Sequence, residues 1–105
     1  MVNPIEVNPY ELFQQECPEL AASLDDLLEA QQKLPGLDSK TRQLINIAIQ
    51  TANRNPRGVA YHAIMARDAG VGRAAVAAAV VMNLHLSGLG PVLDCLPAAM
   101  QAFED

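Results

Sequence analysis

Apolar residues recur every three or four positions along most of the chain, and prolines and glycines separate these runs. That spacing places apolar side chains on one face of an α-helix. The pattern predicts helices over residues 9–16, 18–33, 39–53, 56–69 and 73–86, and a last helix that opens at Pro91 and is kinked or restarted at Pro97. Residues 1–7 are expected to form an extended lead-in. No stretch alternates with period two, so we predict an all-α fold of about six helices.

The most apolar part of the chain is Pro56–Gly90, which contains two of these helices. Gly70 is expected to end the first in a left-handed cap, so that the two form a central antiparallel pair. The second has no charge after Arg73 and is apolar on nearly all sides, which predicts a central or interface helix. The helix over 18–33 has a leucine stripe expected to pack against this pair, made of Leu20, Leu24, Leu27 and Leu28.

The composition limits the core to small aliphatic side chains. Half of the 105 residues are hydrophobic, but only 4% are aromatic and none is tryptophan. A chain of this length forms one domain, here residues 1–105, and hides only roughly 65% of the surface that its unfolded form exposes. Long apolar helices in so small a body predict a homo-oligomer, in which another copy of the chain covers the remaining apolar surface.

The net charge of −5 is unevenly distributed. Residues 1–38 contain eight acidic residues and one lysine, whereas residues 39–105 contain six basic and four acidic residues. No dense basic tract is present, which argues against nucleic-acid binding. The first residues lack the features of a signal peptide, and no uncharged run reaches the roughly 20 apolar residues of a membrane helix. We expect a soluble cytoplasmic protein in which Cys17 and Cys95 are free thiols.

His62 is the first candidate for chemistry, because it lies in otherwise aliphatic helical sequence. Its ordinary pKa of about 6.5 suits a general base near neutral pH, and a buried histidine with one structural hydrogen bond is the alternative. His85 is more readily explained as a buried structural histidine. Two histidines on different helices fall short of the three or four ligands that zinc or iron needs, so we expect no metal and no cofactor.

Amide side chains form a row on one face of the helix over 39–53, spaced three, four and three residues apart. They are Gln43, Asn46, Gln50 and Asn53. The row lines a polar pocket opposite a histidine, or it is the solvent side of the helix. Four arginines bracket His62 and would attract a small anion, unless they lie on solvated helix ends; they are Arg54, Arg57, Arg67 and Arg73. From these groups, Gln43, Asn46 and Arg57 are the candidate ligand-binding residues.

From Leu37 onward, the sequence resembles the carboxymuconolactone decarboxylase family, which includes the alkylhydroperoxidase-D-like (AhpD-like) proteins. The matching text is LDSKTRQLINIAI, the x-x-H-A ending at His62-Ala63, the DAG at 68–70 and, after an alanine-rich helix, GLGPVLDCLPAAMQAF. The match covers about two thirds of the chain. The resemblance implies an AhpD-like helical bundle that forms symmetric homo-oligomers, commonly trimers or hexamers, with pockets between helices.

The resemblance also bears on redox chemistry. The hydroperoxidase branch uses a C-x-x-C-x-x-x-H motif on the helix that matches residues 56–69, with an upstream glutamate in a proton relay. Aligned on His62, the two cysteine positions fall at Asn55 and Gly58, and the glutamate position falls at Gln43. Asn and Gly form no disulfide, and Gln takes no proton. The resemblance therefore implies no CxxC-dependent alkylhydroperoxidase activity, and it is compatible with the decarboxylase branch, which keeps a histidine for proton transfer on lactone acids.

Three functions remain open from the sequence. The first is decarboxylase- or isomerase-like acid–base chemistry by His62 on a small carboxylated or lactone-like molecule. The second is a non-catalytic oligomeric scaffold or binding module. The third is a thiol-dependent antioxidant of the peroxidase or peroxiredoxin type acting through Cys17, which precedes a helix but is flanked by Glu16 and Glu19. Cys95, between two leucines, is expected to be buried.

Overall fold

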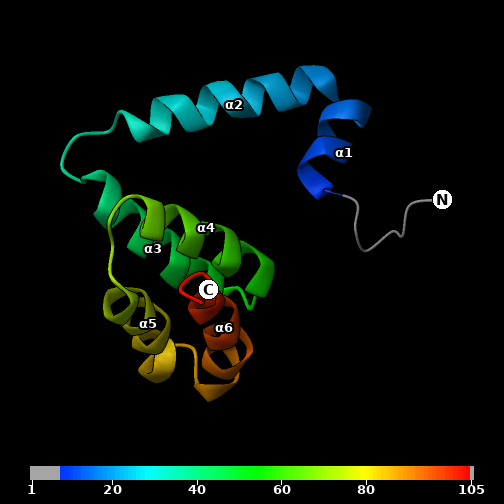
Figure 1. Ribbon diagram of the computed structural model, residues 1–105. Helices are drawn as coiled ribbons and strands as arrows, with labels where there is room; N and C mark the ends of the chain where they lie inside the picture. Colours follow the sequence, from blue (N-terminus) through cyan, green and yellow to red (C-terminus); the bar gives the residue numbers. More distant parts are fainter. Residues whose placement is uncertain (1–7, 105) are drawn as a thin grey trace. The chain divides into compact units, whose positions relative to one another are not determined.

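The structure is a computed structural model that describes residues 8–104, so the expected lead-in over residues 1–7 lies outside the described part. The described residues form six α-helices, one short 3-10 helix and no strand (Figure 1). This confirms the all-α prediction. The chain divides into two compact units, Met1–Gly36 and Leu37–Asp105, and we describe each by itself.

The first unit contains α1 (Pro9–Glu16) and α2 (Pro18–Gln32). Asn8 caps α1, because its side chain accepts hydrogen bonds from the backbone N–H groups of Tyr10 and Glu11. Pro18 has no N–H to continue α1 and instead takes the first position of α2. The Tyr10 hydroxyl donates a hydrogen bond to the Asp25 carboxylate, which links the two helices.

The leucine stripe of α2 is largely exposed. Leu20 is 61% exposed and Leu27 is 58% exposed, and Ala21 is the one residue of α2 that is buried. The periodicity that placed these leucines on one face of a helix therefore predicted the helix correctly. It leaves most of that face without cover within the first unit.

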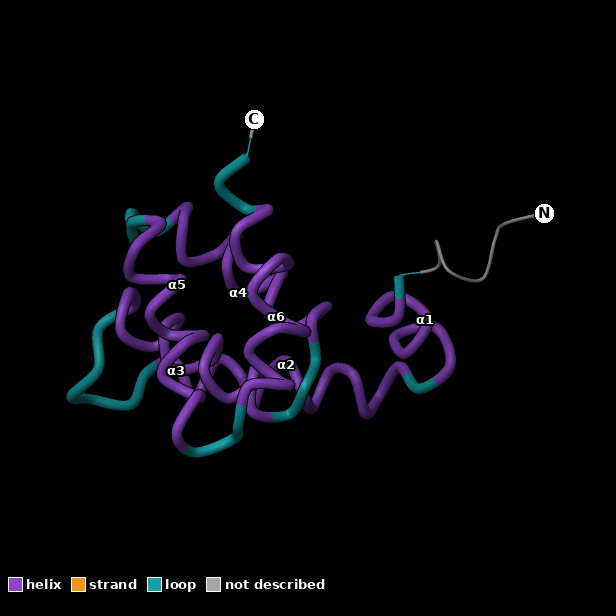
Figure 2. Tube along the Cα trace, turned by 90° about the horizontal axis from the view of Figure 1, so that it is seen from below, coloured by secondary structure: helices purple, strands orange, loops and turns teal. Residues whose placement is uncertain are grey.

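The second unit packs five elements around a core of small aliphatic side chains. They are α3 (Ser39–Ala52), α4 (Pro56–Asp68), α5 (Arg73–Val81), the 3-10 helix η2 (Met82–His85) and α6 (Leu89–Gln101). Helices α3 and α4 lie side by side, and α6 packs against α3, α4 and α5 (Figures 1 and 2). The fully buried residues of this core are Ile47, Val59, Ala63, Ala66, Val76, Val80, Cys95 and Ala99. These small side chains let the helices approach closely, α3 and α4 most of all.

Gly70 ends α4 as predicted. Its φ is +95°, in the left-handed region that glycine adopts without strain. The Gly70 N–H donates to the Arg67 carbonyl, and the Val71 N–H reaches back to the Ala66 carbonyl at 2.9 Å. This pair of bonds is a Schellman motif, which satisfies carbonyls that the helix end would leave unpaired.

The helix predicted over 73–86 is shorter than expected. Helix α5 ends at Val81 and the chain tightens into η2, where the Asn83 side chain is buried and donates to the carbonyls of Ala48 and Val80. The Asn83 carbonyl accepts three backbone N–H groups, from residues 86, 87 and 88, which closes a turn directly after η2. A short polar side chain that binds backbone in this way competes with a regular helix.

The last helix differs from the prediction at both prolines. Helix α6 begins at Leu89, directly after Gly88 at φ +94°, so Pro91 lies inside its first turn, where no N–H is needed for an intrahelical bond. The helix continues through Pro97 to Gln101 and does not restart there.

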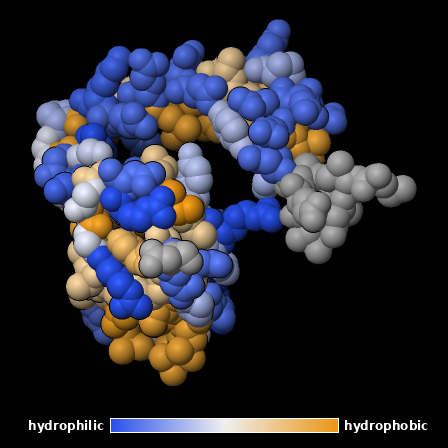
Figure 3. All heavy atoms as spheres, viewed as in Figure 1, coloured by the Kyte–Doolittle hydropathy of each residue, from blue (hydrophilic) through white to orange (hydrophobic). Residues whose placement is uncertain are grey.

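One end of the second unit is strongly apolar at its surface. Figure 3 shows hydrophobic residues gathered there, over α5, η2 and the start of α6. We call this surface the apolar end patch; its exposed members are Val81, Met82, Leu84, Leu86, Leu89 and Leu93. Helix α5, which has no charge after Arg73, is therefore buried along only part of its circumference. No helix among the described residues is both long enough and apolar enough to cross a membrane.

Candidate functional site

The imidazole of His62 is fixed across the α3–α4 interface by Gln43. The distance between His62 Nδ1 and Gln43 Oε1 is 3.0 Å, and the imidazole is half-buried. A carboxamide oxygen only accepts hydrogen bonds, so Nδ1 carries a hydrogen and donates a hydrogen bond to Gln43 Oε1. The neutral ring then keeps Nε2 unprotonated, as the nitrogen that can accept a proton.

Burial lowers the pKa of the His62 imidazole below its ordinary value of 6.5. The cause is desolvation, which disfavours the charged form. Because its pKa is lowered, His62 is neutral near pH 7, the form that a general base requires. The ring of Tyr61 lies beside the imidazole and meets it edge to face, with ring centroids 5.3 Å apart.

The amide row of α3 lies partly along the seam with α4. Gln43, Asn46 and Gln50 are half-buried, whereas Asn53 is exposed. Gln43 binds His62, and Gln50 Oε1 accepts a hydrogen bond of 3.0 Å from Asn55 Nδ2. Asn46 lies between these two glutamines in the row and has no hydrogen bond within the described part of the chain. Gln43 and Gln50 thus border the seam that contains His62, and Asn46 lies between them in the row.

The two positions that the resemblance assigns to redox cysteines have structural roles here. Asn55 caps α4 by accepting a hydrogen bond of 3.2 Å from the Gly58 N–H. Gly58 lies directly under the Gln50 carboxamide, because a Cβ added at Gly58 would lie 2.7 Å from Gln50 Cδ. A side chain at position 58 would displace Gln50 and with it the bond to Asn55.

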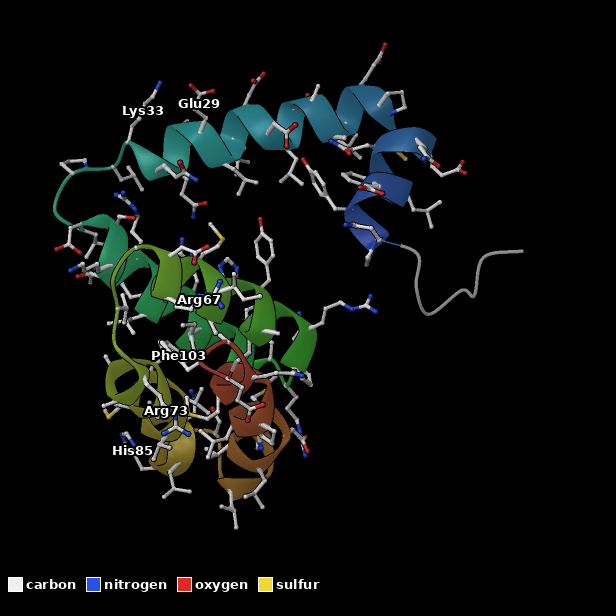
Figure 4. The ribbon with its side chains drawn as sticks, viewed as in Figure 1. Glu29, Lys33, Arg67, Arg73, His85 and Phe103 are labelled. Atoms are coloured by element: carbon white, nitrogen blue, oxygen red, sulfur yellow. The ribbon has the colours of Figure 1, made fainter. Side chains whose placement is uncertain are left out.

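Two of the four arginines near His62 in sequence are engaged elsewhere. Arg54 Nη2 lies 2.7 Å from the Asp94 carboxylate, and Arg67 binds Asp68 and the Ala102 carbonyl, close to the C-terminal turn at Phe103 (Figure 4). Arg57 is exposed in the first turn of α4, with no hydrogen bond or ion pair among the described residues. Of the candidate ligand-binding residues, the structure brings Gln43 to His62; it records no contact of Asn46 or Arg57 with the imidazole.

The remaining candidate groups lie outside this seam. His85 is exposed on η2, so the expectation of a buried structural histidine is wrong at that position; the chain tightens before it and turns its side chain to the surface (Figure 4). Both cysteines are free thiols, as predicted, with Cys17 exposed and Cys95 buried. Burial, and next the neighbouring Asp94, raise the pKa of the Cys95 thiol. Among residues 8–104, no group of three His, Cys, Asp or Glu side chains could hold a metal ion.

Sequence reasoning missed the bond between Gln50 and Asn55. The signal for it is present, because Asn55-Pro56 is a typical helix start and Gln50 belongs to the amide row. The positive φ of Arg54, +52°, turns the chain so that Asn55 faces back onto Gln50, and periodicity does not reveal that turn.

The helical fold agrees with comparison against known families. The family model described as the carboxymuconolactone decarboxylase family matches residues 18–103, which includes α2 and the whole of α3–α6. The chain belongs to this family. Comparison with curated proteins and with solved structures found no match.

Proposed function

We propose that this chain performs decarboxylase- or isomerase-like acid–base chemistry with His62, on a small carboxylated or lactone-like molecule. The observation that supports this proposal is the Nδ1 contact of His62 with Gln43, on an imidazole whose pKa is lowered by burial. Membership of the carboxymuconolactone decarboxylase family supports the substrate class.

In this proposal, Nε2 of His62 removes a proton from a carbon next to a carbonyl group. The C–H electron pair forms a C=C bond while the C=O π pair moves onto the oxygen, and the imidazolium that forms keeps its Nδ1–H on Gln43. Gln43 takes no proton itself, so the same imidazole returns the proton to the product. Asn46, beside Gln43 on the row, and Arg57, exposed on α4, are the proposed contacts for the polar and carboxylate groups of the substrate.

Proton exchange in heavy water tests this function without knowledge of the final product. Carboxylated γ-lactones are incubated with the protein in D2O, and deuterium at the carbon next to the carbonyl is followed by NMR. Exchange is expected with the natural chain and with His85→Asn, whose histidine is exposed on η2. It should disappear in His62→Asn, with unchanged circular dichroism. Equal exchange in His62→Asn would remove His62 from the mechanism.

Ligand binding separates catalysis from a scaffold. A ligand present at 100 times its dissociation constant stabilises the folded state by ~2.7 kcal/mol. Aromatic acids and lactone acids are therefore screened by thermal unfolding of the natural chain. Stabilisation by none of them would favour the non-catalytic scaffold.

The apolar surfaces support a further part of the proposal, a homo-oligomer that is a trimer or hexamer. Leu86 is 80% exposed in the apolar end patch, and Leu20 is 61% exposed on α2. Contiguous apolar surfaces of this kind are typical of protein interfaces. Light scattering should give a mass of three or six chains, and Leu86→Glu should lower it. A monomer at all concentrations would contradict this assembly.

A further inference from the structure

The Gly58 N–H determines which way two neighbouring carboxamides face. A backbone N–H only donates, so the Asn55 atom that meets it at 3.2 Å is the oxygen. The other end of that carboxamide is then Nδ2, which only donates, and its partner at 3.0 Å is the oxygen of Gln50. One backbone donor thereby orients both side chains.

This orientation leaves N–H groups unused. Both N–H bonds of Gln50 Nε2 and the second N–H bond of Asn55 Nδ2 have no acceptor among the described residues. The two carboxamides are also held in place, because the Asn55 backbone N–H binds the Gln50 carbonyl at 2.9 Å. Glycine at position 58 allows this close packing. The pair is thus a fixed set of uncharged donors, in a partly exposed position that a ligand can reach.

Gly58, against which the pair packs, lies one helical turn from His62. Gly58 and His62 are four residues apart on the same face of α4, about 6 Å along its axis. On α3, Gln43, which holds the imidazole, and the donor Gln50 belong to the same row of amides. Donors and base therefore border the same seam between α3 and α4.

From this arrangement we infer that Gln50 Nε2 and Asn55 Nδ2 bind the carbonyl oxygen of the ligand and stabilise it as an enolate oxygen. The inference rests on the proposed role of His62. The C–H bond breaks and the proton goes to His62 Nε2; the C–H electron pair forms a C=C bond, and the π pair of the C=O bond moves onto the oxygen held by the donors. Return of the proton reverses these changes, so no further reactant is needed. The site then selects small carbonyl compounds with an acidic C–H bond.

Replacement Gln50→Glu tests this assignment with little change of shape. The glutamate still accepts from Asn55 Nδ2, but an oxygen replaces the outward Nε2 donor. Asn53→Asp is the matched control, since it adds the same charge at an exposed member of the row. The probe is γ-butyrolactone, and the side-chain amide signals of Gln50 and Asn55 are followed by NMR during its titration.

The probe should shift both amide signals in the natural chain. Its apparent affinity should fall about tenfold or more in Gln50→Glu and stay within about twofold in Asn53→Asp, a difference that corresponds to one lost ligand interaction. If the probe leaves the Gln50 signal unmoved, or if both variants bind alike, the donor assignment is wrong, even where exchange still depends on His62. Loss of the His62 role is detected separately, by unchanged deuterium exchange in His62→Asn.

Discussion

The Nδ1 atom of His62 lies 3.0 Å from Oε1 of Gln43, across the interface of α4 and α3. Nineteen residues separate the two in the sequence, and the packed core of the second unit brings them together. Gln43 is a positioning residue, because it fixes the proton on Nδ1 and leaves Nε2 for chemistry. The predictions below follow from this contact, from the neighbouring carboxamides and from the burial of individual groups.

Replacement of Gln43 by glutamate should raise the pKa of His62. A carboxylate at hydrogen-bond distance favours the imidazolium, by about one pKa unit or more, and opposes the effect of burial. The pKa is measured by NMR titration of the imidazole protons. Identical His62 titrations would show that Gln43 does not bind the ring in solution.

Stability should depend on pH through His62. Burial lowers the pKa of the folded imidazole, so the unfolded chain takes up a proton below about pH 6.5 while the folded chain still resists it. The free energy of unfolding is therefore unaffected above that pH and decreases as the pH falls from about 6.5 toward the folded pKa. Urea unfolding across this range measures the slope. His62→Gln should remove this contribution, and His85→Gln should retain it.

Gly58→Ala should have different effects in two backgrounds. Alanine in a helix is more stable than glycine by roughly 0.5–1 kcal/mol. In the natural chain, the new Cβ displaces the Gln50 carboxamide and breaks its bond to Asn55, which offsets that gain by about 1 kcal/mol. In a Gln50→Ala background this loss is absent and only Asn55 Nδ2, 2.8 Å from the new Cβ, has to shift, so a net gain should appear in urea unfolding. The same change in both backgrounds would show that the two side chains are not coupled.

The two thiols should differ in reactivity. Cys17 is exposed, whereas Cys95 is buried and burial raises its thiol pKa, so the reactive thiolate is rare there. Native alkylation followed by mass spectrometry should give one adduct per chain, and none in Cys17→Ser. Equal labelling of Cys95 would mean that the core opens readily around α6.

The helices and most of their ends could be predicted from the sequence, because they depend on local signals. Proline residues and the Gly70 cap place helix ends at single residues, and the structure confirms the cap at Gly70. The end of α5 could not be predicted in this way. The Asn83 side chain binds the carbonyl of Ala48, 35 residues away, and only the packed unit brings those groups together.

The candidate site could be predicted in its residue types but not in its contacts. The spacing of Gln43 and Gln50 placed both on one face of α3, and the question of pocket or solvent stayed open. The answer depends on α4, where His62 meets Gln43 and the cap residue Asn55 meets Gln50. The count of charges near His62 does not predict that Arg54 binds Asp94 and that Arg67 binds the Ala102 carbonyl, because these partners are distant in sequence.

The central claim, that Gln43 holds His62 neutral with Nε2 free, is tested most directly by long-range ¹H–¹⁵N NMR of the imidazole ring near pH 7. This experiment distinguishes the two neutral tautomers and the cation. The account predicts that His62 carries its proton on Nδ1 and that the fraction of this tautomer falls in Gln43→Ala. A His62 protonated on Nε2 or on both nitrogens would contradict it.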